Sequence, residues 1–588
     1  YDPVLFAGII GFMAGVIAIS VKLFLIQVAD SKEYLVKPAR VINRNGLPLY
    51  SYNPRIEKLT RLLGAGTIYD RNKRILATSN VEQIKSNEDS LKNAGVDMLQ
   101  LRQLFYKKHE RYYPFGADLF FWTGDYNTRL FWGQANGFYA EARYLTALRG
   151  FATNPQKEDY IGTSYRPDRF TKPVEKPQTL VSYDYSPLAD ALQSGIDSTN
   201  PRIVKMKAMN RDVRLTVDAS LQKEIQDSLR LSAFADKRMS VIVIDAAKGD
   251  VMASAVYPLP NLKDPEKMLL TEKEKSRLPM PVTDRDLGMS YATAPGSTAK
   301  ILTAIAALNK EGMEAADKKY NDIYRTEIFR DNAKEQEPFV PKVRYVDMQE
   351  AIINSSNIYF IRVANEFNLE NELGDLYQAT GMNISHRGGY YYEPSADRLK
   401  VSKDLEAWRE DVFTMDRRLY NNPENYGIKK RYRSDFSGLA WGQSKLTSTP
   451  IAMARMAGAI ANKGRMQLSR YVMEETGTAK APGEAVTIAK DTAYAGLLRK
   501  YMISQSSQPG KQKIKGMDVA GKTGTPERIV KGEKQSDGWY VFFAPTPDNL
   551  SHTVCCIRIE EGQSSANAVI IANTVSKILK KRGYIVSF

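Results

Sequence analysis

The chain has 588 residues, too many for one compact core, so we expect at least two domains. Apolar residues make up 43% of it and charged residues 26%, a balance that excludes a wholly disordered protein. The 83 basic residues outnumber the 67 acidic ones, and the formal net charge of +16 favours an anionic partner such as nucleic acid, an anionic membrane or an acidic polymer. We find no zinc-finger spacing, no RNP-like aromatic box and no P-loop, so nucleic acid is a distant alternative.

An apolar stretch at residues 4–29 opens the sequence and matches the ~20 apolar residues that cross a bilayer. Its polar members, Lys22 and Gln27, lie near its end, where their side chains can extend to the interface. No small-residue cleavage site follows, so we expect a retained membrane anchor, with a buried core helix as the alternative. Basic residues are more frequent after the span, which would place the body in the cytoplasm. The first residue is not methionine, and we expect orienting charges upstream of it to have been lost.

Residues 30–208 are predicted to form a polar, tyrosine-rich module with short strands and a helical stretch near 141–150. The pattern changes at Arg211, where alternating apolar residues predict a strand that runs to Val217. Asp218 and Ser220 are candidate caps of the helix that follows. We therefore expect a second domain to begin close to this strand.

The remaining sequence predicts strands on both sides of a helix-rich middle. Two strands joined by a turn are expected at 239–258, helices at 298–312, 346–368 and 450–464, further strands between 517 and 561, and a closing helix at 566–581. This order indicates an α+β fold with an antiparallel sheet. The polar segment at 388–437 is predicted to be a long insertion or loop.

The cysteines and histidines limit the kinds of catalytic mechanism that the sequence supports. Cys555 and Cys556 are adjacent on a predicted strand and point to opposite faces, so we expect two buried thiols rather than a strained disulfide. The three histidines, His109, His386 and His552, lie neither in an HExxH motif nor near a nucleophile elbow. Metal-dependent hydrolysis and a Ser-His-Asp triad are therefore unsupported, and a catalytic base would be lysine or a carboxylate.

The stretch "APGSTAK" places Ser297 one helical turn before Lys300, at the start of an apolar helix. This spacing alone is weak, because "SLQK" at 220–223 shares it in what looks like a capped helix start. Two more elements follow in order, "SSN" at 355–357 and "KTGT" at 522–525. The ordered combination favours a nucleophilic serine beside a lysine base over a simple helix cap.

In these three motifs the sequence resembles the penicillin-binding protein transpeptidases and the related serine β-lactamases. The neighbours are similar too: "YATAPGSTAKI" resembles the family's Tyr-x-Pro-Gly-Ser-x-x-Lys run, "LTVDASLQ" its opening strand and helix, and "TSTPIAMARMAGAIANKG" its late helix. "GTIYDRNKRILATS", "RYYPFGAD" and "EARYLTALRG" resemble the class B pedestal. No glycosyltransferase domain precedes it, which favours class B.

The resemblance implies three parts: a transmembrane anchor at 4–29, an elongated mixed pedestal (dimerisation-like) domain at 30–208 and a transpeptidase domain at 209–588. The last would be the penicillin-binding-protein/β-lactamase-like α+β fold, an antiparallel sheet with a helical subdomain. The sequence departs from the family at Phe542, where many relatives have glycine, and in the unusually aromatic run at 111–124. The segment at 388–437 matches no family feature.

The resemblance also implies roles for the motif residues. Ser297 would be the nucleophile and Lys300 its base, kept neutral by desolvation and by the second cation of Lys522. Ser355 would relay a proton to the leaving amine, and Asn357 would hold Lys300 and the donor amide.

The "KTGT" segment would bind substrate. Lys522 and the hydroxyls of Thr523 and Thr525 suit a terminal carboxylate, while Gly524 would let a peptide lie alongside the strand as an added β-partner. The oxyanion hole would be formed by the backbone N–H groups of Ser297 and Thr525.

The implied reaction joins peptidoglycan stem peptides: a D-Ala-D-Ala stem acylates the serine, D-Ala leaves, and an amine of a neighbouring stem takes the acyl group, with no metal or cofactor. β-Lactams would acylate the same serine. A D,D-carboxypeptidase, a β-lactamase or a penicillin sensor remain alternatives. The implied location is the bacterial inner membrane, single-pass with the catalytic domain on the periplasmic side, beside a membrane glycan polymerase and other cell-wall proteins.

Overall fold

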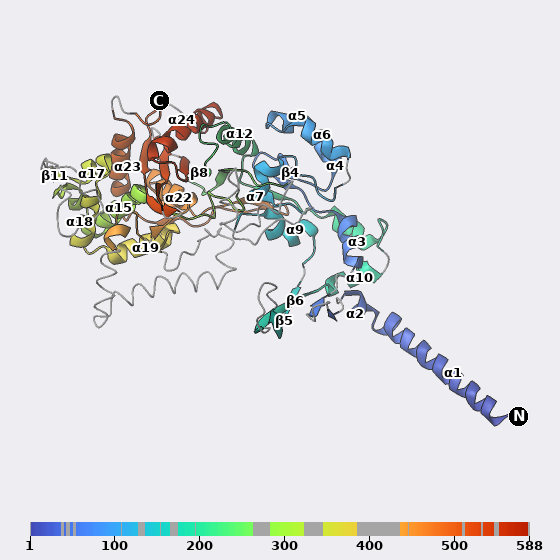
Figure 1. Cartoon of the computed structure of the whole chain (residues 1–588). Helices are drawn as coiled ribbons and strands as arrows, with labels where there is room; N and C mark the ends of the chain where they lie inside the picture. The colour runs from blue at the N-terminus through green and yellow to red at the C-terminus, as the bar shows by residue number, and fades with distance from the viewer. Residues whose placement is uncertain are drawn as a thin grey trace, which may run out of the picture.

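Figure 1 shows the computed structural model of the chain. The structure describes residues 2–36, 40–42, 48–50, 54–106, 109–126, 136–152, 154–164, 174–193, 196–262, 283–322, 345–384, 436–444, 446–508, 512–530, 533–545 and 552–585. Nearly all of the predicted insertion at 388–437 lies outside these residues, as does His386.

A helix, α1 (Pro3–Phe24), projects from the body in Figure 1 and continues through a π-helical turn, η1 (Leu25–Ala29). Asp2 caps it by accepting a hydrogen bond from the N–H of Val4 at 3.0 Å. None of its side chains is buried, and it is long and apolar enough to cross a membrane. The predicted apolar span is therefore confirmed as one exposed helix, the form that a membrane anchor takes.

Short helices and strands follow, up to Arg211. They are α2 (Ser31–Val36), β1 (Arg40–Ile42), β2 (Pro48–Tyr50), α3 (Pro54–Leu63), β3 (Ile68–Tyr69), β4 (Ile75–Ala77), α4 (Val81–Lys85), α5 (Glu88–Asn93), α6 (Met98–Tyr106), η2 (Gly116–Leu119), α7 (Phe120–Thr123), α8 (Ala140–Arg143), α9 (Leu145–Arg149), β5 (Asn154–Ser164), β6 (Val174–Asp184), η3 (Ser186–Leu188), α10 (Ala189–Gln193) and α11 (Pro201–Ala208). The helical stretch predicted near 141–150 is thus two short helices, α8 and α9. Strands β5 and β6 pair into a ribbon at the lower side of the body in Figure 1.

A five-stranded sheet connects the part of the chain before Arg211 to the rest, in the order β16-β15-β7-β3-β4. Its other members are β7 (Val213–Leu215), β15 (Val472–Glu475) and β16 (Thr478–Ala479). Strand β3 pairs in parallel with β7, Ile68 opposite Val213. Strands from both sides of the predicted boundary at 208/209 thus share one hydrogen-bonded ladder, so backbone hydrogen bonds hold the two parts together.

The second sheet is antiparallel throughout, in the order β18-β21-β22-β8-β9. Its strands are β8 (Met239–Asp245), β9 (Val251–Tyr257), β18 (Ala520–Gly524), β21 (Gly538–Phe543) and β22 (Thr553–Ile559). Helices α12 (Ala219–Arg230) and α24 (Ser565–Lys581) cover one face, and α22 (Pro450–Ala461) covers the other. The predicted α+β fold with an antiparallel sheet is confirmed.

Side chains alternate across this sheet as the strand period requires. Cys555 packs on the α24 side and Cys556 on the α22 side, and both are buried free thiols, as predicted. Phe542, the departure from the family, is fully buried on the α24 side and stacks on Tyr540 with ring centroids 5.2 Å apart. It lies opposite Gly521 in the neighbouring strand, but Tyr540 and Ser506 occupy the space beside this glycine, where a Cβ would come within 2.7 Å of both hydroxyl groups.

A helical layer packs beside the second sheet and carries two of the three motifs. Its elements and the remaining short strands are η4 (Gly296–Ala299), α15 (Lys300–Glu311), α16 (Glu314–Asp317), β10 (Tyr320–Asn321), β11 (Tyr345–Val346), α17 (Met348–Asn354), α18 (Asn357–Glu366), α19 (Glu370–Thr380), β12 (Asn383–Ile384), β13 (Leu446–Thr447), β14 (Arg465–Met466), β17 (Val486–Thr487), α23 (Thr492–Ser506), β19 (Glu527–Val530) and β20 (Glu533–Ser536). Of the two predicted caps of α12, Asp218 is confirmed, whereas Ser220 is wrong because it lies inside the helix. Asp218 accepts from Ser220 N and Leu221 N at the start of α12, and Pro450 is the first residue of α22.

Candidate active site

Ser297 lies on a 3₁₀ turn, η4, that leads directly into α15. The sequence predicted an α-helical turn, but the 3₁₀ geometry, with about three residues per turn, aligns positions i and i+3 more closely. Ser297 and Lys300 therefore emerge on the same side. Gly296 precedes the serine at φ +57°, a left-handed conformation that favours glycine, and donates its N–H to Gly442 O at 2.8 Å.

Ser355 joins α17 to α18 in a left-handed conformation, with φ 57° and ψ 40°. This conformation costs a non-glycine residue about 1–2 kcal/mol, and such strain concentrates at functional sites. The next residue, Ser356, caps α18 by accepting from Tyr359 N, so Asn357 becomes the first residue of that helix. The sharp turn thereby brings Ser355 and Asn357 toward Lys300.

The side-chain nitrogen of Lys300 is fully buried and lies within hydrogen-bonding distance of three oxygen atoms. They are Ser355 O at 2.5 Å, Ser355 Oγ at 3.2 Å and Asn357 Oδ1 at 2.6 Å. Burial, followed by repulsion from the Lys522 cation, lowers the pKa of Lys300 well below its usual value, while Asp322 opposes the shift. The lysine is thus held in an environment that favours its neutral, proton-accepting form.

Lys522 reaches the same serine from the edge strand β18. Its Nζ donates to Ser355 Oγ at 3.0 Å and to Thr523 O at 2.9 Å, and the side chain is fully buried. Burial, with a smaller contribution from Lys513, lowers the pKa of Lys522 to about 7. The three predicted motifs therefore meet at one point, with the Ser355 hydroxyl between two lysines.

Strand β18 is an outer strand of its sheet, and among the residues that the structure describes no strand pairs with its other backbone edge, which could therefore take up a further strand. Gly524, at its end, lies against the serine turn: a Cβ here would come within 2.7 Å of Pro295 O and 3.0 Å of Thr298 Cγ2. The sequence predicted that this glycine makes room for a peptide. The structure adds a second reason for it, the close approach of β18 to the turn that carries Ser297.

The hydroxyl groups of Thr523 and Thr525 each already accept one hydrogen bond. Thr523 Oγ1 accepts from Gln505 Nε2 at 3.2 Å, and Thr525 Oγ1 accepts from the N–H of Ser565 at 3.1 Å. Each keeps its own O–H for donation, which suits an anion such as a carboxylate.

Two residues near the site were not predicted from the sequence. Asp322 accepts from Ser356 Oγ at 2.6 Å and acts on the Lys300 pKa, and Gln505 holds Thr523. Neither lies in a motif or close in sequence to the residue that it contacts, so no sequence signal marks them.

The other candidates lie elsewhere. The ring of His109 lies edge-on to Tyr112, and His552 is exposed before β22. In the decoy "SLQK", Lys223 pairs with Asp227 within α12, as a helix start predicts. No cluster of metal-ligating side chains occurs among the described residues.

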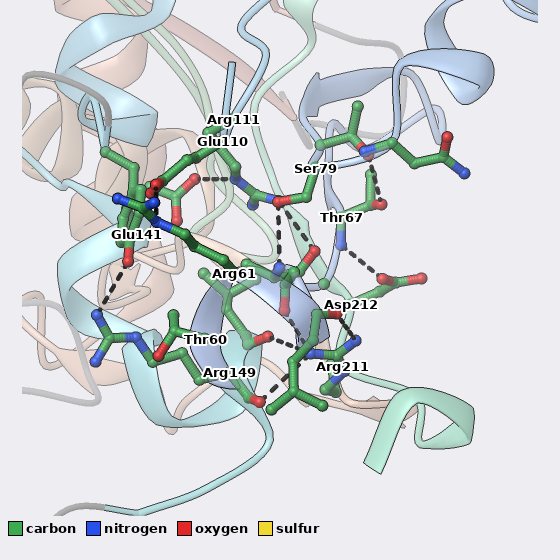
Figure 2. A pocket seen from close by; sticks show the side chains of 18 of the residues that line it. Thr60, Arg61, Thr67, Ser79, Glu110, Arg111, Glu141, Arg149, Arg211 and Asp212 are labelled. Atoms are coloured by element: carbon green, nitrogen blue, oxygen red, sulfur yellow. Dashed lines mark hydrogen bonds and ion pairs between the residues drawn. The ribbon is translucent and has the colours of Figure 1, made fainter. Parts of the chain in front are cut away.

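A cavity of about 830 Å³ is lined by residues between Thr60 and Asp212 and not by the residues of the serine turn (Figure 2). The guanidinium of Arg211 donates to Leu63 O at 3.1 Å and Gly64 O at 2.7 Å, at the end of α3, and to Arg149 O at 3.4 Å, at the end of α9. A positive charge at helix C-termini is favourable. Arg211 lies two residues before β7, so it ties α3 and α9 to the segment that enters this strand.

A serine turn with a buried lysine, set against the edge of an antiparallel sheet, defines a class of serine acyltransferases that use lysine as base. Residues 239–580, more than half of the chain, match the penicillin binding protein transpeptidase domain, and the chain belongs to this family.

Individual relatives are distant. Penicillin-binding protein 3 of Bacillus subtilis (strain 168) is 21% identical over 363 residues, which are 59% of this chain and 48% of that protein, so the chain spans about half of this relative's length. Penicillin-binding protein A of Mycobacterium tuberculosis, solved as a penicillin G acyl-enzyme complex, has a TM-score of 0.56 and 17% identity, with 88% of this chain and 99% of that chain covered. The D,D-transpeptidase domain of a peptidoglycan glycosyltransferase from Eggerthella lenta has a TM-score of 0.52 and 18% identity, covering 89% and 99%. At these identities the likeness shows the fold.

Proposed function

We propose that the chain is a class B peptidoglycan D,D-transpeptidase that works through an acyl-enzyme on Ser297. The observation that carries this proposal is the pair of buried lysines, Lys300 and Lys522, which share the Ser355 hydroxyl beside the serine turn. Burying two cations is costly, and a neutral lysine next to a serine is the form that activates it.

In the first half-reaction, Ser297 Oγ bonds to the carbonyl carbon of the penultimate D-Ala, and Lys300 Nζ takes the hydroxyl proton. The C–N bond to the terminal D-Ala breaks, Ser355 passes its proton to the leaving amine, and Ser355 regains a proton from Lys300, which returns to its neutral form. In the second, the acceptor amine bonds to the acyl carbon and loses a proton to Lys300, the bond from the acyl carbon to Ser297 Oγ breaks, and Ser297 leaves as the alcohol with the proton that Lys300 returns to it. The N–H groups of Ser297 and Thr525 would stabilise the oxyanion of each tetrahedral intermediate.

Substrate would bind along β18 as an added strand, since no strand in the described part of the chain pairs with its outer edge. The terminal carboxylate would lie near Lys522 and accept from the free hydroxyl hydrogens of Thr523 and Thr525. The strand edge that would pair with the peptide and the side chains that would bind its carboxylate both lie at the end of β18, close to the serine turn.

The domain plan follows from the same proposal: an anchor at 4–29, a pedestal at 30–208 and a transpeptidase domain at 209–588. Helix α1 would hold the protein in the bacterial inner membrane, with the catalytic domain on the periplasmic side. There it would meet stem peptides and work with a membrane glycan polymerase and other cell-wall proteins.

Labelling with a fluorescent penicillin tests the proposal. The parent chain should be labelled covalently, Ser297→Ala should not, and Ser220→Ala, which alters the decoy motif, should label like the parent. Labelling that survives Ser297→Ala would refute the assignment. Incubation with lipid-linked glycan strands should give cross-linked product; release of D-Ala without cross-links would identify a carboxypeptidase, and rapid loss of the label a β-lactamase.

A further inference from the structure

Four charged side chains form a cluster at one end of the second sheet: one lies on β22, one directly after β22, one directly before β21, and one on the neighbouring strand β19. We call Arg528, Asp537, Arg558 and Glu560 the Arg558 cluster. Arg558 pairs with Glu560 at 3.1 Å, Glu560 with Arg528 at 3.3 Å, and Arg528 with Asp537 at 3.0 Å. The side chains of Arg558 and Asp537 are 1% exposed and that of Glu560 6%. Two cations and two carboxylates thus form a continuous, mostly buried chain of ion pairs.

One end of the cluster holds the segment that leads to Ser297. Arg558 Nη1 donates to Tyr291 O at 2.8 Å and to Thr293 Oγ1 at 3.3 Å. Its guanidinium also lies over the Tyr291 ring, 4.8 Å from the centroid. Thr293 in turn exchanges both backbone hydrogen bonds with Ser448, so this segment is held from two sides.

The other end holds the segment that follows Thr525. Arg528 lies on β19, two residues after Pro526, and Asp537 donates its N–H to Pro526 O at 3.0 Å. Pro526 packs against the residue before the serine: a Cβ on Gly296 would come within 2.9 Å of the Pro526 ring. The cluster therefore connects the two segments that would supply the oxyanion hole, and these segments touch at Gly296 and Pro526.

Stability alone is a weak reason for such a cluster. Buried ion pairs are often no more stabilising than apolar residues of the same volume, because desolvation cancels much of the attraction. What they impose is a defined distance and direction between the groups they join. An oxyanion hole depends on such a fixed distance and direction, because its two N–H donors must lie about 2.7–3.1 Å from the same oxygen atom.

We propose that the Arg558 cluster positions the N–H groups of Ser297 and Thr525 relative to each other, so that Arg528, Asp537, Arg558 and Glu560 are positioning residues for acyl transfer. This inference rests on the proposed function. It predicts that disturbing the cluster slows the covalent step without weakening the initial binding of the acylating agent, because binding along β18 does not depend on where the oxyanion forms.

Stopped-flow acylation by penicillin G, which separates the acylation rate constant k2 from the dissociation constant of the initial complex, tests this on the full chain. Arg558→Met should lower k2 about 10- to 100-fold, the loss expected from misplacing a catalytic group by up to 1 Å. The dissociation constant should change less than about twofold. Glu560→Gln, which keeps shape and removes charge, should act in the same direction, and Arg558→Lys should recover part of k2.

Arg111→Met is the matched control. Arg111 and Glu141 form a pedestal ion pair of 2.7 Å in which both side chains are 1% exposed. This variant should lose thermal stability yet keep the parent k2. If both arginine variants change k2 equally, or if Arg558→Met and Glu560→Gln leave k2 unchanged while lowering the melting temperature, the positioning role is refuted. Failure of the parent chain to be acylated at all would instead refute the proposed function.

Discussion

Gly524→Ala should impair acylation even though the glycine takes no part in the chemistry. The new Cβ would lie 2.7 Å from Pro295 O and 3.0 Å from Thr298 Cγ2, both in the segment around Ser297. Comfortable contacts need about 3.5 Å, so β18 and the serine turn would have to separate by roughly 0.5–1 Å. Strain of this kind costs about 1–3 kcal/mol, and a shift of this size at a reacting group reduces rates by up to about 100-fold.

The assay is the acylation rate with penicillin G, measured together with unfolding by urea. Gly374→Ala is a suitable control: this glycine lies within α19 with no atom within 4 Å of a Cβ position, so alanine should stabilise the fold by about 0.5–1 kcal/mol and leave acylation unchanged. Parent-like acylation and stability in Gly524→Ala would show that the turn and the strand can separate freely, contrary to the packing described above.

Three further predictions concern the lysines and the pedestal. Lys300→Met should slow acylation by about 10²–10⁴-fold, the usual contribution of a general base; rapid labelling would contradict its role as base. Because the pKa of Lys522 is lowered to about 7 in the fold, the unfolded chain binds more protons between about pH 7 and 10.4, so stability should rise with pH across that window. Melting temperatures measured from pH 6.5 to 10 should rise in the parent and rise less in Lys522→Met. An equal rise with pH in the two proteins would argue against this contribution of Lys522 to stability. Arg211→Met leaves carbonyls at the ends of α3 and α9 without their donor, so it should lower the free energy of unfolding in urea by about 2 kcal/mol and leave k2 unchanged. A lowered k2 at the stability of the parent would contradict a purely structural role for Arg211.

Local sequence determined much of what was predicted correctly. The apolar span at 4–29, the Asp218 cap, Pro450 at the start of α22 and the closing helix α24 depend on neighbours within a few residues, so their signals are periodic or adjacent. The candidate site residues could be proposed because each motif is short and their order is unusual. Even there, the 3₁₀ form of the serine turn was not predicted, because three-residue spacing fits both helix types.

Tertiary structure alone decided how the motifs meet and what supports them. That β18 is an outer strand, that β3 and β4 join a ladder with β7 across the predicted domain boundary, and that Gly524 touches the serine turn all follow from pairings between distant residues. The same holds for the Arg558 cluster, whose members look like ordinary strand and turn charges in sequence. The sequence by itself determined which residues could perform the chemistry. Only the folded chain determined the environment that sets their protonation, because it buries Lys300 and Lys522 around Ser355. Burial of this kind is a property of all the surrounding segments together.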